Sequence, residues 1–134
     1  MPQPRTPAVA SLELIVEAAP SSLAVLRTVS AAFARSLGVD EESVEAVAVA
    51  VNEAASNSLV HGYREDEHGT LRLAASLAGS KLAITLSDDG VGDQAGTREG
   101  DEVGRGFPLM RALADGVDVS RGERGTRVRL TFPL

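Results

Sequence analysis

Residues 50–63 read AVNEAASNSLVHGY, and this stretch is the most informative part of the sequence for both fold and chemistry. Its apolar residues continue a helical repeat that begins at the acidic cluster DEES and stops at a glycine, so we expect one helix over residues 40–60. Glu53, Asn57 and His61 are spaced i, i+4 and i+8 along it. This spacing places the three polar side chains on one stripe of the helix.

The sequence on either side of this helix predicts strands, hairpins and further helices. Before it, alternating residues indicate a strand, and a second helical repeat ends at a glycine. After it, two alternating stretches flank a turn, a Gly-rich polar loop follows, and a short helix precedes another hairpin. The expected elements are, in order, a strand at 12–17, helices at 22–37 and 40–60, strands at 71–77 and 81–88, a helix at 107–114, and strands at 117–119 and 127–132.

This order of elements predicts the fold class. Helices and strands come in blocks and the strands are joined by short turns, which is typical of an α/β (α+β) two-layer sandwich with helices on a mixed, mostly antiparallel sheet. Residues 1–10 contain prolines at positions 2, 4 and 7 and are expected to be a flexible leader. The length of 134 residues then predicts one domain, over residues 11–134.

Composition and charge exclude several classes of protein. The chain has no cysteine, which removes disulfides, cysteine zinc sites and thiol nucleophiles, and its two histidines are too few for a histidine-rich metal site. Aromatic residues make up 3% and the net charge is −6, and both disfavour binding to nucleic acid. The longest apolar run, 46–51, is far shorter than the roughly 20 residues that cross a membrane, and the N-terminus lacks the apolar core of a signal peptide. We therefore expect a cytoplasmic protein that binds neither nucleic acid nor membrane.

The pair Glu53 and Asn57 is the first candidate for chemistry. An acid and an amide one helical turn apart suit a hydrated Mg²⁺ ion with a base beside it, because Mg²⁺ keeps several waters and needs only one or two protein oxygens. The alternative is a solvated helix face. Asparagine is a poor residue for a helix interior, which favours the functional interpretation.

A second candidate follows the strand at 81–88, where residues 88–92 read DDGVG. Asp88 shares its strand face with Leu86 and is predicted to point into the buried layer, whereas Asp89 points away. A buried carboxylate is destabilising unless a donor reaches it, and an adenine amino group would be such a donor. The alternative is an ordinary Asp-Gly turn.

Two further candidates lie closer to the C-terminus. Gly104, Arg105 and Gly106 directly precede the short helix, and a Gly-rich turn that leads into a helix N-terminus suits an anion. The alternative there is a hinge at a helix start. Thr126 shares its strand face with Val128, so its hydroxyl is predicted to face inward, either into a pocket or onto backbone groups.

Four stretches in this order resemble the motifs of one family. AVNEAASNSLVHGY at 50–63, DDGVG at 88–92, GRGFPLMRALAD at 104–115 and GTRVRLTF at 125–132 are similar to the N, G1 and G2 boxes and the terminal Gly-Thr strand of the GHKL (Bergerat) ATP-binding domain. That domain is shared by gyrase, the Hsp90 chaperone, histidine kinases and MutL. Within this superfamily the chain most resembles the anti-sigma factor serine/threonine kinases, because Glu53 stands where histidine kinases usually carry Asn.

The resemblance implies ATP and Mg²⁺ as cofactors and a role for each residue of these motifs. Glu53 would act as general base toward a substrate hydroxyl, Asn57 would ligate Mg²⁺, and Asp88 would bind the adenine amino group. The remaining residues that the resemblance assigns to the nucleotide are His61, Gly90, Gly92, Gly104, Arg105, Gly106 and Thr126.

By the same resemblance, the chain would phosphorylate a Ser or Thr of a small anti-anti-sigma antagonist protein and hold a sigma factor inactive. Two alternatives stay open: a nucleotide-binding module that switches partners without phosphotransfer, and the detached ATPase half of a histidine kinase. The expected lid at 93–103 has Glu102 and Val103 where some relatives carry a basic or hydroxyl residue, and this favours the first alternative. Ile15, apolar on the outward face of the first strand, is a hint of a homodimer interface.

Overall fold

The computed structural model describes residues 11–61, 68–90, 107–122 and 125–134. Their helices and strands follow the order that the sequence predicts. They are β1 (Ser11–Glu17), α1 (Ser22–Ser36), α2 (Glu41–His61), β2 (Thr70–Ala78), β3 (Lys81–Asp88), α3 (Phe107–Leu113), β4 (Gly116–Gly122) and β5 (Gly125–Pro133).

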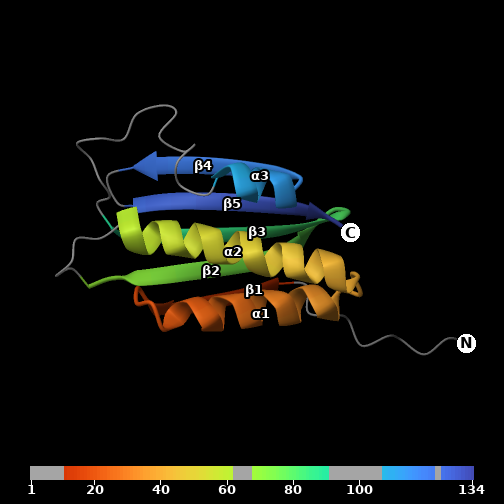
Figure 1. Cartoon of the computed structure of the whole chain (residues 1–134), viewed down its shortest axis with the longest axis horizontal. Coiled ribbons are helices and arrows are strands. Elements are labelled where there is room, and N and C mark those ends of the chain that lie inside the picture. Colours follow the sequence, from red (N-terminus) through yellow and green to blue (C-terminus); the bar gives the residue numbers. More distant parts are fainter. Residues whose placement is uncertain (1–10, 62–67, 91–106, 123–124) are drawn as a thin grey trace, which may run out of the picture.

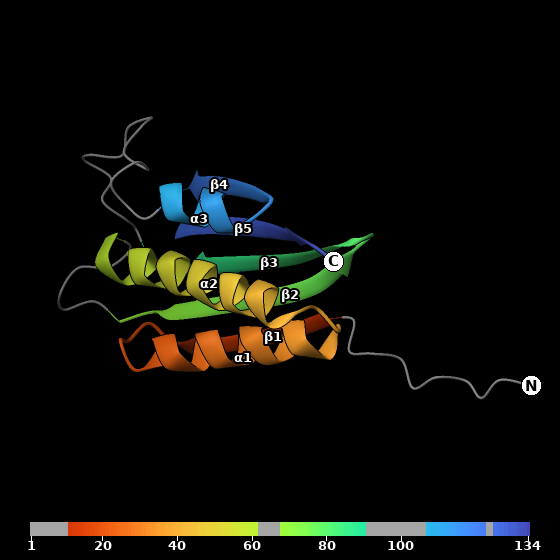
Figure 2. The same ribbon diagram turned by 45° about the vertical axis from the view of Figure 1, so that its right-hand side comes forward.

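The strands form a five-stranded sheet in the order β1-β2-β3-β5-β4. Each neighbouring pair in this sheet is antiparallel. Figures 1 and 2 show the described helices on one face of the sheet, with α1 beside β1, α2 along the centre and α3 near β4. The predicted two-layer sandwich of helices on a sheet is confirmed, and the pairing is antiparallel throughout the described strands.

The core lies between the sheet and α2. Inward-facing residues of the central strands, including Leu73, Ile84 and Leu130, are 0% exposed. Fully burying one such side chain stabilises the fold by about 1.5–3 kcal/mol, so this layer fixes α2 against β3 and β5. The apolar face that α2 turns toward the sheet consists of small side chains, namely Val44, Val47, Ala50, Val51, Ala54 and Ala55.

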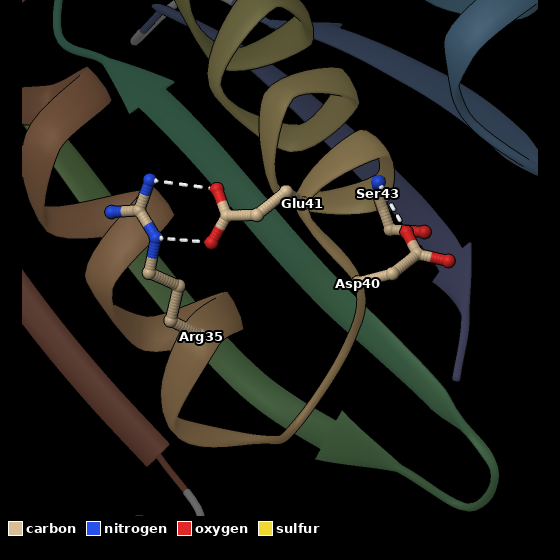
Figure 3. Close-up of polar contacts among 4 residues, drawn as sticks. All are labelled: Arg35, Asp40, Glu41 and Ser43. Atoms are coloured by element: carbon tan, nitrogen blue, oxygen red, sulfur yellow. Dashed lines mark hydrogen bonds and ion pairs between the residues drawn. The ribbon is translucent and has the colours of Figure 1, made fainter.

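The connection from α1 to α2 is fixed by the polar contacts drawn in Figure 3. Arg35, in the last turn of α1, donates to both carboxylate oxygens of Glu41, over 2.9 and 3.1 Å. The backbone N–H of Ser43 donates to Asp40 Oδ1 over 2.8 Å, which caps the first turn of α2 as the sequence predicts. Between the helices, Gly38 has a φ of +83°, the left-handed conformation that ends α1.

The ends of some elements differ from the prediction. β4 covers 116–122 instead of 117–119, because its whole length pairs with β5, from Gly116 opposite Thr131 to Gly122 opposite Gly125. The short helix α3 ends at Leu113, one residue earlier than expected. Among the described residues, no helix combines the length and the apolar character needed to cross a membrane.

Candidate functional site

The candidate site lies at one edge of the sheet, where three elements meet. Asp88 is the last residue of β3, Gly125 is the first residue of β5, and α2 ends nearby at His61. In Figure 1 these three ends lie together at the left of the molecule. The fold therefore brings Asp88 and the Gly125-Thr126 pair, which are far apart in the sequence, against the last turns of α2. The same helix carries Glu53 and Asn57.

Asp88 is the centre of this edge. It is 8% exposed, as its strand face predicts, and its Oδ1 atom accepts hydrogen bonds from the backbone N–H groups of Gly90, over 3.1 Å, and Thr126, over 3.2 Å. The hydroxyl of Ser58, on α2, donates to the same carboxylate. Burial raises the pKa of Asp88 above the usual Asp value, and the three donors, led by Ser58, partly oppose that rise. The arrangement is a buried acceptor held by groups from both layers.

Gly125 passes closely over the backbone of Asp88. A Cβ atom placed on Gly125 would lie 1.9 Å from the carbonyl oxygen of Asp88, and the φ of Gly125 is +124°. Both facts require glycine at this position. Gly125 therefore lets β5 reach Asp88, so that the next residue, Thr126, can donate its backbone N–H to the carboxylate.

Asp89 has a different role from its neighbour. It is exposed, as predicted, and its carboxylate accepts from the backbone N–H of Thr70, over 3.1 Å, and from the Thr70 hydroxyl, over 3.3 Å. Asp89 thus fixes the start of β2 to the end of β3. Its negative charge also contributes to the raised pKa of Asp88.

Glu53 and Asn57 lie on α2 one turn apart, and both side chains are partly exposed. The residue before Glu53, Asn52, accepts a hydrogen bond of 2.7 Å from Arg27 of α1, which fixes this part of α2 to its neighbour. Among the described residues, no cluster of three or more His, Asp or Glu side chains could hold a metal ion. Asn57 offers one amide oxygen, and Mg²⁺, which keeps several waters, needs only one or two protein oxygens.

Part of the predicted site falls outside the described residues. Gly92, Gly104, Arg105 and Gly106 and the expected lid lie there, and of His61 only the backbone, at the end of α2, is described. Thr126 is partly buried, and it reaches Asp88 through its backbone N–H, whereas the sequence drew attention to its hydroxyl.

Ser58 is the member of the site that the sequence analysis missed. It follows Val51 and Ala55 at helical spacing on the apolar face of α2 and is 7% exposed. A hydroxyl on a face otherwise made of Val, Ala and Leu needs a buried partner. That mismatch was the available signal, and Asp88 is the partner.

Known proteins share this sequence pattern. A family model described as the histidine kinase-like ATPase domain matches residues 16–132. The anti-sigma F factor of Thermoanaerobacter sp. (strain X514) is 35% identical over 116 residues, which cover 78% of this chain and 80% of that protein. The anti-sigma F factor of Clostridium botulinum (strain Eklund 17B / Type B) is 30% identical over 118 residues, which cover 80% of this chain and 82% of that protein.

Solved structures share the fold. The RsbU and RsbW domains of a Mycobacterium tuberculosis protein give a TM-score of 0.72 at 22% identity, over 92% of this chain and 32% of that longer chain. The histidine kinase domain of the Erythrobacter litoralis EL346 blue-light activated histidine kinase gives a TM-score of 0.52 at 27% identity, over 69% of this chain and 45% of that chain. The family match spans most of this chain, and the anti-sigma F factors are matched over most of their own length. The chain therefore belongs to the histidine kinase-like ATPase domain family, in the group that includes the anti-sigma F factors.

Proposed function

We propose that this chain is an ATP·Mg²⁺-dependent protein serine/threonine kinase of the anti-sigma type, which phosphorylates a small anti-anti-sigma antagonist protein and holds a sigma factor inactive. The observation that carries the proposal is Asp88, a buried carboxylate that accepts hydrogen bonds from the backbone N–H groups of Gly90 and Thr126. Glu53 and Asn57, one turn apart on the partly exposed side of α2, support it. Family membership and the similarity to anti-sigma F factors support it.

In this proposal Asp88 binds the base of the nucleotide. The exocyclic amino group of adenine is a donor and a carboxylate is an acceptor, so their pairing compensates for the burial of the charge. Gly90 and Gly92 would shape the wall of the base site, because glycine lets backbone approach a ligand closely. Thr126, beside Asp88 in the sheet, would complete that site.

The phosphates and the metal would be held by α2 and by the segment ahead of α3. Asn57 offers an amide oxygen to Mg²⁺, and His61 lies one turn further along the same stripe. Gly104, Arg105 and Gly106 are the proposed phosphate contacts, since backbone N–H groups and a cation suit an anion. When bound, Mg²⁺ would neutralise negative charge on the phosphates.

Glu53 is the proposed base. It lies one helical turn before Asn57, so its carboxylate can approach the phosphates without ligating the metal. From there it would accept a proton from a substrate Ser or Thr hydroxyl, or orient that hydroxyl for attack. Phosphoryl transfer depends mainly on positioning and charge stabilisation, which a base, a metal and phosphate contacts provide.

The test is a pair of measurements on Glu53→Gln: Mg·ATP affinity by calorimetry, and transfer of labelled phosphate from ATP to a candidate antagonist protein. We expect transfer to slow by about 10²–10⁴-fold. Affinity should stay within a few-fold, because an amide fills nearly the same volume as a carboxylate. Glu45→Gln, an exposed position on the same helix, is the matched control. Asn57→Ala should instead weaken Mg²⁺-dependent ATP binding itself.

The outcomes separate this proposal from its alternatives. Unchanged phosphate transfer in Glu53→Gln would show that Glu53 is not the base. If the parent protein binds both ATP and the antagonist but transfers no phosphate, the nucleotide-binding switch module replaces the kinase. Glu102 and Val103, just before Gly104, are the sequence feature that favours this second candidate. An acid-labile label on a partner histidine would indicate the ATPase half of a histidine kinase.

A further inference from the structure

We propose that the face of the sheet opposite the helices, which we call the open face, binds a second copy of this chain, with β1 of each copy over β5 of the other. The inference goes beyond the proposed function, because it assigns a partner to a surface on the other side of the sheet from α2 and its candidate site residues. It depends neither on phosphate transfer nor on nucleotide binding.

The described helices leave one face of the sheet uncovered. Figures 1 and 2 show α1, α2 and α3 on the same side of the strands. On the other side, none of the outward side chains of β1, β2 and β5 is buried, and Ile15 is 60% exposed. Antiparallel sheets commonly leave one face to solvent, so the case for a partner has to come from the residues on that face.

The charges on the open face are segregated by strand. β1 presents the exposed carboxylates of Glu13 and Glu17. β5 presents the exposed guanidinium groups of Arg127 and Arg129, and neither forms a salt bridge within the described residues. An acidic strand and a basic strand on one face make that face complementary to itself, which is the condition for a two-fold dimer.

The register of the sheet shows which side chains would meet. Glu13 stands opposite Ala74, and Ala74 stands opposite Thr85. Thr85 in turn stands opposite Arg129, so these four residues form one row across the sheet. A two-fold axis parallel to the strands, between β2 and β3, keeps this row in place and reverses its order. It sets Glu13 over Arg129 of the second copy, and Ala74 over Thr85.

Other two-fold axes give poorer charge contacts. An axis perpendicular to the strands lays β1 over β1 and β5 over β5, so carboxylates meet carboxylates and guanidinium groups meet guanidinium groups. An axis along β3 lays Arg72 over Arg127 and Glu13 over Asp118. Like charges placed opposite each other disfavour association. An axis between β3 and β5 leaves β1 outside the interface. The charge pattern therefore selects the axis between β2 and β3.

The middle of the open face permits close approach. Most outward side chains of β2 and β3 are small, namely Ala74, Ser76, Ala83, Thr85 and Ser87. Sheets pack face to face at about 10 Å, a distance that Glu13 and Arg129 can bridge. In the next row Ile15 would cover the aliphatic part of Arg127 of the second copy.

The size of the overlap sets the expected affinity. Four strands about 4.8 Å apart and about 24 Å long cover roughly 450 Å² in each copy. A standard interface buries about 800 Å² per partner, so this one belongs to the weak class. We expect a dimer that forms at micromolar concentrations and that salt weakens, because its specificity comes from exposed charges.

The first experiment exchanges the charges that would meet. Sedimentation equilibrium of the full chain, across micromolar concentrations and in about 50 and about 500 mM salt, measures self-association. The variants are Glu13→Arg, Arg129→Glu and the double variant Glu13→Arg/Arg129→Glu. Glu45→Arg, at an exposed position of α2, is the matched control for a reversed charge. Thermal unfolding of each variant checks its fold.

We expect the parent to dimerise and each single reversal to weaken the dimer at least about 10-fold, because like charges then meet twice. The double variant should return to within a few-fold of the parent. Within one chain, Glu13→Arg loses the 2.9 Å ion pair with Arg72, and Arg129→Glu stands beside Asp118. The double variant keeps both of these changes, so its recovery would have to come from contacts between copies.

The second experiment locates the axis. The chain has no cysteine, so a single introduced thiol is the only target for a short bismaleimide cross-linker. Thr85→Cys, in the middle of the overlap, should link two copies. Ser120→Cys lies on the same face but on β4, outside the overlap, and should stay unlinked.

Three results would overturn the inference. One is a parent chain that stays monomeric across the whole concentration range. Another is a dimer that both single reversals leave unchanged, or a double variant that associates no better than the singles. The third is equal cross-linking at positions 85 and 120. None of these measurements involves ATP, so a failure here is distinct from a failure of the proposed kinase.

Discussion

Asp88 carries opposite demands on stability and on binding. Its burial disfavours the charge, yet in the proposed function the charged carboxylate would be the stronger acceptor for an amino group of the ligand. Gly90, Thr126 and Ser58 reduce this conflict without removing it, because the pKa of the carboxyl remains raised. Such a residue is expected to weaken the free protein slightly and to strengthen the complex.

The first prediction concerns Asp88→Asn and binding. The amide loses the charged acceptor, so affinity for Mg·ADP should fall by about 1.5–3 kcal/mol, roughly 10- to 150-fold. Asp89→Asn is the matched control, since Asp89 is exposed and holds Thr70. Calorimetric titration of both variants is the measurement, and equal losses at the two positions would contradict the assignment of Asp88 to the base.

The same substitution should have the opposite effect on stability. Because folding raises the pKa of Asp88, the folded chain binds this proton more tightly than the unfolded chain does. The free energy of unfolding therefore declines as pH rises from the ordinary Asp pKa, about 3.9, to the folded value, and it stays low above that. Asp88→Asn should unfold at a higher urea concentration than the parent at neutral pH. The difference should shrink toward pH 4; a difference independent of pH would show that the charge is not its cause.

Gly125 allows a third prediction at this scale. Gly125→Ala forces a side chain into a positive φ and against the Asp88 carbonyl, so we expect a loss of about 2–4 kcal/mol in the free energy of unfolding. Gly122→Ala, at the other end of the same strand connection, meets nothing within 4 Å and should be close to neutral. Denaturant unfolding of the two variants measures the contrast, and similar stabilities would mean that β5 does not need this close approach.

At the scale of single elements, α2 combines a face that packs in the core with a stripe that carries candidate site residues. One face packs on the sheet, and the neighbouring stripe carries Glu53 and Asn57. The sequence predicted this helix well because its signals are local: an Asp40 cap, a helical apolar repeat and a terminal glycine. It could not predict which partner Ser58 meets, since that depends on a strand 30 residues away.

Asp40 provides the prediction for this element. Asp40→Ala removes the acceptor for the Ser43 N–H and a negative charge at the positive end of α2, so the thermal midpoint at pH 7 should fall by several degrees. The Ser43 N–H lowers the pKa of Asp40, so this stabilisation is present above the unfolded pKa and is lost as pH falls through the folded pKa. When thermal unfolding is measured from pH 7 to about pH 3, the difference in thermal midpoint between the parent and Asp40→Ala should shrink. Asp40→Asn keeps a hydrogen-bond acceptor, so its thermal midpoint should lie between those of the parent and Asp40→Ala. If its midpoint equals that of Asp40→Ala, the charge and not the cap hydrogen bond accounts for the stabilisation.

At the scale of the whole molecule, alternation predicted which strand residues face the helices, and the blocks of elements predicted the two layers. The strand order β1-β2-β3-β5-β4 was not predicted, because no local pattern says that β5 inserts between β3 and β4. That insertion is what places Gly125 and Thr126 against Asp88. Individual candidate residues were therefore visible in the sequence, and their contacts required the folded chain.

The direction in which β3 runs has a practical consequence. Asp88 ends the strand, and Lys81, seven residues earlier, begins it, so the two ends of β3 are roughly 23 Å apart. The last residue, Leu134, lies at the Lys81 end, where its N–H donates to the Ser80 carbonyl over 3.2 Å. A fluorophore, an affinity handle or a sensor chip coupled at residue 134 would stand a full strand length from the end of α2. The chain can thus be immobilised through residue 134 for partner capture, with the Asp88 edge facing the solution.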